Sequence, residues 1–139
     1  MSVYNDSMPE LTFVFDYHRY PIVPVKFSYN DVDTPIIDAL LDSGGDFIVI
    51  PMPIAKYLGL KLKKAGSVDT AGGTTTLFKS NLNMTMGKKE HNTSYNNLEI
   101  HVSARGDIPV LLGRKPIFED YEITFKKTEN HLILKSNSQ

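Results

Sequence analysis

Asp42 is the residue of this sequence best placed to do chemistry. It ends the apolar run Ala39–Leu41, and a second apolar run, Phe47–Ile50, follows soon after. A carboxylate between two buried strands is unfavourable unless it is paired or hydrogen-bonded. Between the two runs, Gly44 and Gly45 allow another part of a chain to approach closely. We therefore interpret this stretch as a loop that presents a carboxylate from a rigid scaffold, and not as an ordinary Asp-Ser-Gly turn.

Hydrolysis of a peptide bond is the reaction that such a carboxylate could perform with a second one. One group, ionised, takes a proton from water, and the other, protonated, donates one. Asp69, in the stretch Val68–Gly72, is the nearest copy of the motif, but Ala71 stands where the tight turn needs glycine and its flanks are polar. We exclude it as a catalytic partner. The second carboxylate would then come from another copy of the chain across a two-fold axis.

The chain has 139 residues and a net charge of −1, which is the size of one domain and favours neither nucleic-acid nor membrane partners. We expect a single domain over residues 8–135, with flexible ends at 1–7 and 136–139. Cysteine is absent and the four histidines lack ligand spacing, so no metal or other cofactor is expected. The first residues lack the features of a signal peptide, and no apolar run is long enough to span a membrane. We therefore expect a soluble, cytoplasmic protein.

Many short runs with strand patterning must position Asp42. The sequence predicts strands at Leu11–Phe15, Ile22–Tyr29, Pro35–Leu41, Phe47–Ile50, Leu82–Met86, Leu98–Val102, Val110–Leu112, Tyr121–Phe125 and His131–Leu134. Val68–Phe78 predicts a hairpin whose tip lies near Gly72 and Gly73. Short helices are expected after Pro51 and over Arg114–Asp120. This pattern indicates an all-β domain, closed or sandwiched.

Two motifs together give the chain a resemblance to a known family. Leu40–Asp46 with the following Ile48–Ile50 resembles the active-site motif of retropepsin-like aspartic proteases. Val110–Arg114, an apolar run closing on Gly-Arg, resembles their second hallmark, and the Val68–Thr76 hairpin occupies the place of their flap. The resemblance covers roughly residues 20–125 and is closer to the stand-alone cellular or prokaryotic members than to the viral ones. It implies an all-β, closed acid-protease barrel with one or two short helices, and an obligate homodimer.

The resemblance also implies roles for individual residues. Asp42 of each subunit would form the catalytic dyad, Ser43 would bond across the two-fold axis, and Gly44 would contact substrate or keep the loop tight. Asp46 would bind substrate backbone and pair with Arg114. The flap would comprise Val68, Asp69, Thr70, Ala71, Gly72 and Gly73, and side-chain pockets would be lined by Ile50, Val68 and Val110.

Two departures from the family pattern stand out. Gly45 replaces the more usual alanine, which loosens the loop slightly. The chain also continues beyond Phe125, where compact viral members end, so its dimer sheet could be built differently. On this view His131–Lys135 could supply the strand for that sheet.

Three functional hypotheses follow. The first is a homodimeric aspartic endopeptidase that acts on a peptide or protein substrate. The second is a catalytically silent dimeric module that keeps the fold and binds peptides or acts as a scaffold. The third is an unrelated β-barrel binding module in which the motif occurs by chance. Retention of Asp42, Ser43 and Gly44 favours the first over the second, and the second motif with the flap disfavours the third.

Overall fold

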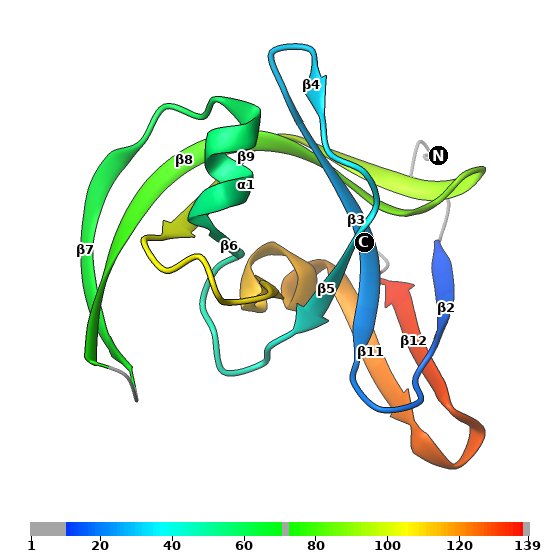
Figure 1. Ribbon diagram of the computed structural model, residues 1–139. Helices are drawn as coiled ribbons and strands as arrows, with labels where there is room; N and C mark the ends of the chain where they lie inside the picture. The colour runs from blue at the N-terminus through cyan, green and yellow to red at the C-terminus, as the bar shows by residue number, and fades with distance from the viewer. Residues whose placement is uncertain (1–10, 71–72, 138–139) are drawn as a thin grey trace, which may run out of the picture.

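Strands form more than half of the computed structural model, which describes residues 11–70 and 73–137 (Figure 1). Eight of them make one sheet in the order β4, β3, β5, β10, β6, β9, β8 and β7. Its members are β3 (Ile22–Tyr29), β4 (Val32–Asp33), β5 (Ile37–Leu41), β6 (Val49–Pro51), β7 (Lys63–Thr70), β8 (Gly73–Lys88), β9 (His91–Ser103) and β10 (Val110–Leu112). Because β3 also pairs with β8, six of these strands close into a barrel. The expected all-β class and closed barrel are thus confirmed.

The Asp42 loop connects β5 to β6, and these two strands are separated in the sheet by β10. β10 runs parallel to β5, with Leu112 opposite Leu41, and antiparallel to β6, with Leu111 opposite Val49. The chain therefore leaves β5, skips one strand position and returns in β6. The gap so created is filled by β10, which arrives about seventy residues later (112 − 41 = 71). Two segments far apart in the sequence thus fix the base of the loop.

Pro24 lies inside β3 without breaking the sheet. β3 pairs with β5 over Ile22–Val25 and with β8 over Val25–Ser28, so the two partners overlap only at Val25. Proline lacks the N–H that a second ladder would need. It therefore fits where β3 has only one neighbour. The following Asn30 and Asp31 both have positive φ, as in the tight hairpin turns that such residues favour, and lead into β4.

β8 and β9 are much longer than the sequence predicted. β8 includes both the second half of the predicted Val68–Phe78 hairpin and the predicted strand Leu82–Met86. β9 begins at His91, seven residues before the predicted start at Leu98. A bulge in the pairing lies between Leu82 and Met84, and Asn97 beside it has φ of 52°. The prediction of shorter strands was wrong because the polar residues Asn92, Thr93 and Ser94 pair regularly with β8 on a largely exposed part of the sheet, and the bulge accommodates the change of register beyond them.

A second sheet of three strands, in the order β11, β12 and β2, lies beside the barrel. Its members are β2 (Thr12–Asp16), β11 (Tyr121–Lys126) and β12 (His131–Ser136), with η2 (Lys127–Glu129) joining the last two. The central strand is β12, so both of its edges are already paired within the chain. This corrects the expectation that His131–Lys135 supplies a dimer strand. Ser136 still belongs to β12 and Asn137 bonds the Asp120 carbonyl, so the strand continues past the expected boundary at 135.

Two short helical segments complete the fold. The helix α1 (Met52–Leu58) follows Pro51 directly and ends at Gly59, whose φ of 71° suits a left-handed cap. The irregular helical segment η1 (Arg114–Phe118) follows β10. One apolar core cluster draws on strands of both sheets and includes Phe13, Phe27, Ile50, Leu112 and Leu134, all fully buried or nearly so.

Candidate active site

Hydrogen bonds fold the Asp42 loop tightly. The Asp42 N–H donates to the Leu112 carbonyl oxygen at 2.9 Å, which ties the residue to β10. The Gly45 N–H donates to the Asp42 carbonyl oxygen at 3.2 Å, and the Gly44 N–H donates to Asp42 Oδ1 at 3.1 Å. A backbone N–H bonded to a carboxylate fixes the orientation of that carboxylate. The half-buried Asp42 side chain is therefore held by the loop's own backbone.

The segment η1 clamps the far side of this loop. Arg114 N–H donates to the Gly45 carbonyl oxygen at 2.8 Å, and Lys115 N–H donates to the Asp46 carbonyl oxygen at 2.9 Å. The Arg114 guanidinium also contacts the Asp46 carboxylate and the Gly45 carbonyl oxygen. Both side chains are largely exposed, so the ion pair adds little stability by itself. The ion pair occupies the Asp46 carboxylate, so that Asp42 is the acid of the loop that Arg114 does not pair with.

Gly113 permits this close approach of η1 to the loop. A Cβ atom there would lie against the Phe47 carbonyl oxygen, 2.8 Å from Phe47 N and 2.9 Å from the Gly45 carbonyl oxygen. All three are backbone atoms, which cannot swing away. At Gly45, a Cβ atom would lie 3.0 Å from Asp42 Oδ2, so the alanine usual in the resembled family would press on the carboxylate here.

Ser43 lies at the exposed end of the loop. Within the described parts of the chain its hydroxyl has no hydrogen-bond partner. Asp69, which the sequence already disfavoured as a second acid, lies on β7, and its Oδ1 accepts a bond from the Thr74 hydroxyl at 3.1 Å. That bond crosses the hairpin between β7 and β8. It gives Asp69 a local structural partner in the flap.

The expected flap is the hairpin of β7 and β8. Its paired part reaches Thr70 opposite Gly73, and Val68 pairs with Thr75. Ala71 and Gly72, which were expected to form the tip, lie outside the described residues. The hairpin is longer than expected, because β7 begins at Lys63, and it curves away from the barrel (Figure 1).

A cavity of about 370 Å³ lies between the flap and the Asp42 loop. Most of its lining is apolar and comes from five strands and the loops beside them: Asp46, Phe47, Val49, Val68, Thr75, Leu77, His101, Ser103, Arg105, Ile108 and Leu111. Val68 was expected here. Ile50 and Val110 were also expected, but both are buried in the core. Their neighbours Val49 and Leu111 line the cavity, because successive residues of a strand face opposite sides.

His101 is a cavity residue that sequence reasoning missed. Its ring lies 4.6 Å from that of Phe47, centroid to centroid, and its buried Nε2 atom has no hydrogen-bond partner among the residues that the structure describes. Burial lowers the pKa of His101, so the neutral ring is favoured. The available signal was strand alternation: His101 lies between the core residues Ile100 and Val102, and therefore faces away from the core.

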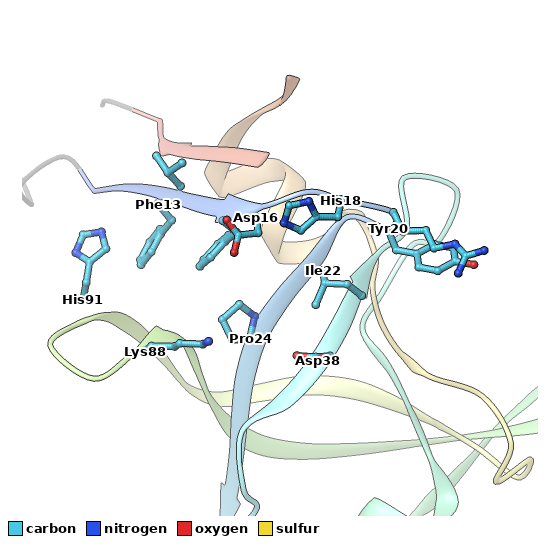
Figure 2. Close-up of a pocket in the computed structure, with 12 residues that line it drawn as sticks. Phe13, Asp16, His18, Tyr20, Ile22, Pro24, Asp38, Lys88 and His91 are labelled. Carbon is cyan, nitrogen blue, oxygen red and sulfur yellow. The ribbon is translucent and has the colours of Figure 1, made fainter. Parts of the chain in front are cut away.

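A larger groove, of about 560 Å³, lies away from the Asp42 loop (Figure 2). Phe13 reaches into it from β2, Pro24 and Asp38 face it from β3 and β5, and Lys88 and His91 close one end. None of its lining residues belongs to the Asp42 loop, to β7 or to the part of β8 that pairs with β7. Size alone therefore does not identify the functional site, and the smaller cavity is the one adjacent to the candidate chemistry.

Across residues 11–70 and 73–137, no three histidine, aspartate or glutamate side chains come together in a way that could hold a metal ion. In the same part of the chain, no helix has the length and apolar character needed to traverse a bilayer.

The barrel, the strand crossing beneath Asp42 and the flap together define an acid-protease type of domain. A family model described as aspartyl protease matches residues 23–115, which include both sequence motifs and the flap. That match covers more than half of the chain. The chain therefore belongs to the aspartyl protease family. A search of curated proteins finds no match.

Solved structures share the fold. A retropepsin-like aspartic protease from Rickettsia conorii aligns over 88% of this chain and 98% of its own, with a TM-score of 0.65 and 22% sequence identity. EIAV protease, solved in complex with the inhibitor HBY-793, aligns over 76% of this chain and 91% of its own, with a TM-score of 0.53 and 20% identity. The fold is thus that of the retropepsin-like aspartic proteases.

Proposed function

We propose that this chain is an aspartic endopeptidase that works as a homodimer. Water would be activated between two Asp42 carboxylates, one from each subunit. The observation that carries the proposal is the loop itself: backbone N–H groups, β10 and η1 all fix Asp42, while the loop's other acid, Asp46, is engaged by Arg114. One fixed carboxylate is half of the machinery that acid–base hydrolysis needs.

The chemistry follows from bringing two such loops together. Two carboxylates at close range cannot both be ionised easily, so the pair holds a proton between them. The ionised group removes a proton from water, which attacks the peptide carbonyl carbon. The protonated group stabilises the developing charge on the carbonyl oxygen by a hydrogen bond. It then donates its proton to the amine nitrogen as the C–N bond breaks. Ser43, exposed beside Asp42, would bond across the two-fold axis.

An extended peptide is the proposed substrate. It would lie between the flap hairpin and the Asp42 loop, where strand-like backbone bonding holds a peptide straight. The cavity beneath the flap has Phe47, Val49, Leu77 and Leu111 among its walls, so it favours an apolar side chain next to the scissile bond. Closure of the flap would exclude water other than the attacking molecule.

A peptide-library assay at mildly acidic pH tests the activity. The protein is expected to cleave, to be blocked by a statine-type inhibitor, and to lose activity when Asp42 is replaced by asparagine. Asp38→Asn, an exposed carboxylate change on the strand that leads to the loop, is the matched control and is expected to leave cleavage intact. A dimer that binds peptide or inhibitor without cleaving would instead favour a silent binding module.

Mixing experiments test whether the site is shared. Wild-type protein and the Asp42→Asn variant are combined in equal amounts and allowed to exchange subunits above the dimer dissociation constant. If both carboxylates of a dimer are required, about a quarter of the dimers remain active, because partners combine at random. A residual activity near one half would mean that each subunit works independently, and would refute the shared site.

A further inference from the structure

The groove of about 560 Å³ that lies away from the Asp42 loop, the β2 groove, separates β2 from the barrel strands β3 and β5 (Figure 2). β2 is the last strand of the small sheet, so one of its edges has no neighbouring strand within residues 11–70 and 73–137. β3 pairs with β8 only from Val25 onward, so the first part of β3 also has an open edge there. Because an open edge can pair with another chain, the directions of the backbone groups decide what the β2 groove can bind.

The backbone of β2 bonds to β12 through its odd-numbered residues. At one end of this pairing, Ser136 N–H donates to the Leu11 carbonyl oxygen at 2.7 Å. At the other end, Tyr17 N–H donates to the Asn130 carbonyl oxygen at 2.8 Å. In an antiparallel pair, residues that bond the partner strand alternate with residues whose backbone groups point the other way. The even-numbered residues of β2 therefore direct their N–H and C=O groups away from β12, along the open edge.

Val14 and Asp16 are the residues of this edge that remain open to another strand. The Thr12 carbonyl oxygen accepts a bond from His91 Nε2 at 2.6 Å, which confirms the direction of the even-numbered groups and closes that end of the edge. Val14 and Asp16 come next along β2, and both line the β2 groove. Each offers one N–H donor and one C=O acceptor, which is the pattern that an added strand requires.

The opposite wall of the groove offers a poorer edge. Leu41 N–H donates to the Pro21 carbonyl oxygen at 3.0 Å, so the odd-numbered residues of β3 bond to β5. Ile22 and Pro24, which also line the groove, therefore direct their backbone groups away from β5. Proline has no N–H, so this edge lacks one of the donors that a ladder needs. A strand that enters the β2 groove is thus expected to pair with β2.

The side chains of the groove walls are apolar where β2 and the barrel face each other. The rings of Phe13 and Phe15 stack at 5.7 Å between centroids, and Ile22 and Pro24 line the barrel side. Side chains of an extended strand point alternately to its two faces. A peptide with apolar residues at every second position would therefore place them against these walls.

Two carboxylates face the middle of the groove from opposite sides, Asp16 from β2 and Asp38 from β5 (Figure 2). Both residues are exposed, and neither takes part in an ion pair within residues 11–70 and 73–137. The positively charged or titratable side chains lie nearer the two ends: His18, Arg19, Lys88 and His91. An occupant that covers the two carboxylates removes them from water, which is unfavourable unless it brings a cation. The middle of the groove therefore complements a basic side chain.

We propose that the β2 groove binds an extended peptide segment of a partner protein, which adds to β2 as a strand. Its backbone bonds to Val14 and Asp16, its apolar side chains lie between β2 and the barrel, and a lysine or arginine lies between Asp16 and Asp38. The lining contains no residue of the Asp42 loop, so this binding is separate from the proposed catalysis.

A charge exchange tests the basic residue. Two short peptides of alternating valine and threonine carry either a lysine or a glutamate at the centre, and their dissociation constants are measured by calorimetry. The Asp42→Asn variant serves as the parent protein, so that the probes are not hydrolysed. It is expected to bind the lysine peptide about ten-fold more tightly than the glutamate peptide. Adding Asp38→Lys is expected to reverse this preference, whereas Asp33→Lys, an exposed change on β4 outside the groove, should keep it.

A proline substitution tests the strand pairing itself. Val14→Pro removes an N–H that points into the groove and leaves the bonds between β2 and β12 in place, as proline on an edge strand does. It is expected to weaken binding of the lysine peptide about ten-fold, whereas Val14→Ala, which keeps the N–H, should bind nearly as the parent does. Circular dichroism checks that both variants fold. In the parent, hydrogen exchange of the Val14 and Asp16 amides is expected to slow when the peptide is added.

Several results would overturn the proposal. Binding of neither peptide, or equal binding of both, contradicts the match between the carboxylates and a basic side chain. Displacement of the lysine peptide by a statine-type inhibitor would place it at the Asp42 loop instead. If the peptide binds only after residues 1–10 are removed, the chain's own first residues are the occupant. If Val14→Pro weakens self-association in sedimentation and leaves peptide binding unchanged, a second copy of the chain is the occupant. None of these results depends on whether the protein cleaves peptides.

Discussion

At the scale of single residues, Gly113, which follows β10, packs closely against the backbone of the Asp42 loop and of Phe47. Its φ of −79° is open to any residue, so the demand for glycine is one of space alone. Replacement by alanine would push Cβ against the backbone of Phe47 and Gly45. We expect Gly113→Ala to lower the free energy of unfolding by about 1–3 kcal/mol, as overpacking does. Urea denaturation measures this.

Gly44→Ala provides the comparison for that variant. Gly44 lies in the Asp42 loop, against which Gly113 packs, but its added Cβ would meet nothing nearer than Asp42 Oδ1 at 3.5 Å, an ordinary contact. The change is expected to leave stability nearly unaltered. An equal loss in the free energy of unfolding for the two variants would contradict the role of Gly113 in allowing η1 to approach the loop.

His101 gives the molecule a pH-dependent stability. Burial lowers its pKa in the folded state below the usual 6.5, so the unfolded chain binds this proton more readily. Stability is therefore complete above pH 6.5 and is lost as pH falls from there through the lowered folded value. We expect His101→Gln to show a smaller drop in melting temperature between pH 7 and pH 5 than the wild type.

His18→Gln is the matching control, because His18 is exposed and lies outside the cavity beneath the flap. It is expected to retain the wild-type pH dependence. If the His101 variant also retained it, the acid-linked loss of stability would have another origin. Thermal unfolding followed by circular dichroism at several pH values distinguishes the two cases.

At the scale of elements, the bulge between β8 and β9 depends on two asparagines. The Asn97 N–H donates to Asn83 Oδ1 at 2.8 Å, and Asn97 has a left-handed φ of 52°. Asn83→Ala removes this bond and is expected to cost about 1 kcal/mol in the free energy of unfolding. Asn96→Ala, an exposed change at the neighbouring position, should cost little. Chemical denaturation of the three proteins compares them, and equal stabilities would contradict the role of Asn83.

Several elements could be predicted from the sequence because their signals are local. The apolar runs on either side of Asp42 and the run ending at Gly113 each identify a strand, and the resemblance gave their order. The bulge at Asn97 could not be predicted, since only the pairing with the partner strand shows that β9 continues through these polar residues. Ile50 and Val110 were placed in the wrong environment because alternation does not say which face of a strand meets the core.

At the scale of the whole molecule, Tyr95 connects the barrel to the start of the second sheet. Its hydroxyl donates to Asp120 Oδ2 at 2.8 Å, and burial together with this bond raises the pKa of Tyr95. A bond to a charged group contributes more than a neutral one. We expect Tyr95→Phe to lower the free energy of unfolding by about 1–2 kcal/mol. Thermal and urea unfolding at neutral pH measure it.

The same bond predicts behaviour at alkaline pH. Because the pKa of Tyr95 is raised on folding, its contribution is complete below the unfolded value near 10 and is lost as pH rises above it. The Tyr95→Phe variant should therefore lose less stability above pH 10 than the wild type. Tyr57→Phe, at an exposed tyrosine bonded to the Asp33 carbonyl, is the control that should follow the wild type.

The pairing of β2 with β12 has a consequence for how the protein is made. Thr12 lies opposite Lys135, 123 residues later (135 − 12 = 123), so the small sheet joins the two ends of the described chain. During synthesis, the first strand has to wait for the last one to leave the ribosome, and such distant pairings form slowly. β11 likewise gains its partner β12 only at that moment. A nascent chain therefore carries the Asp42 loop well before the small sheet can form.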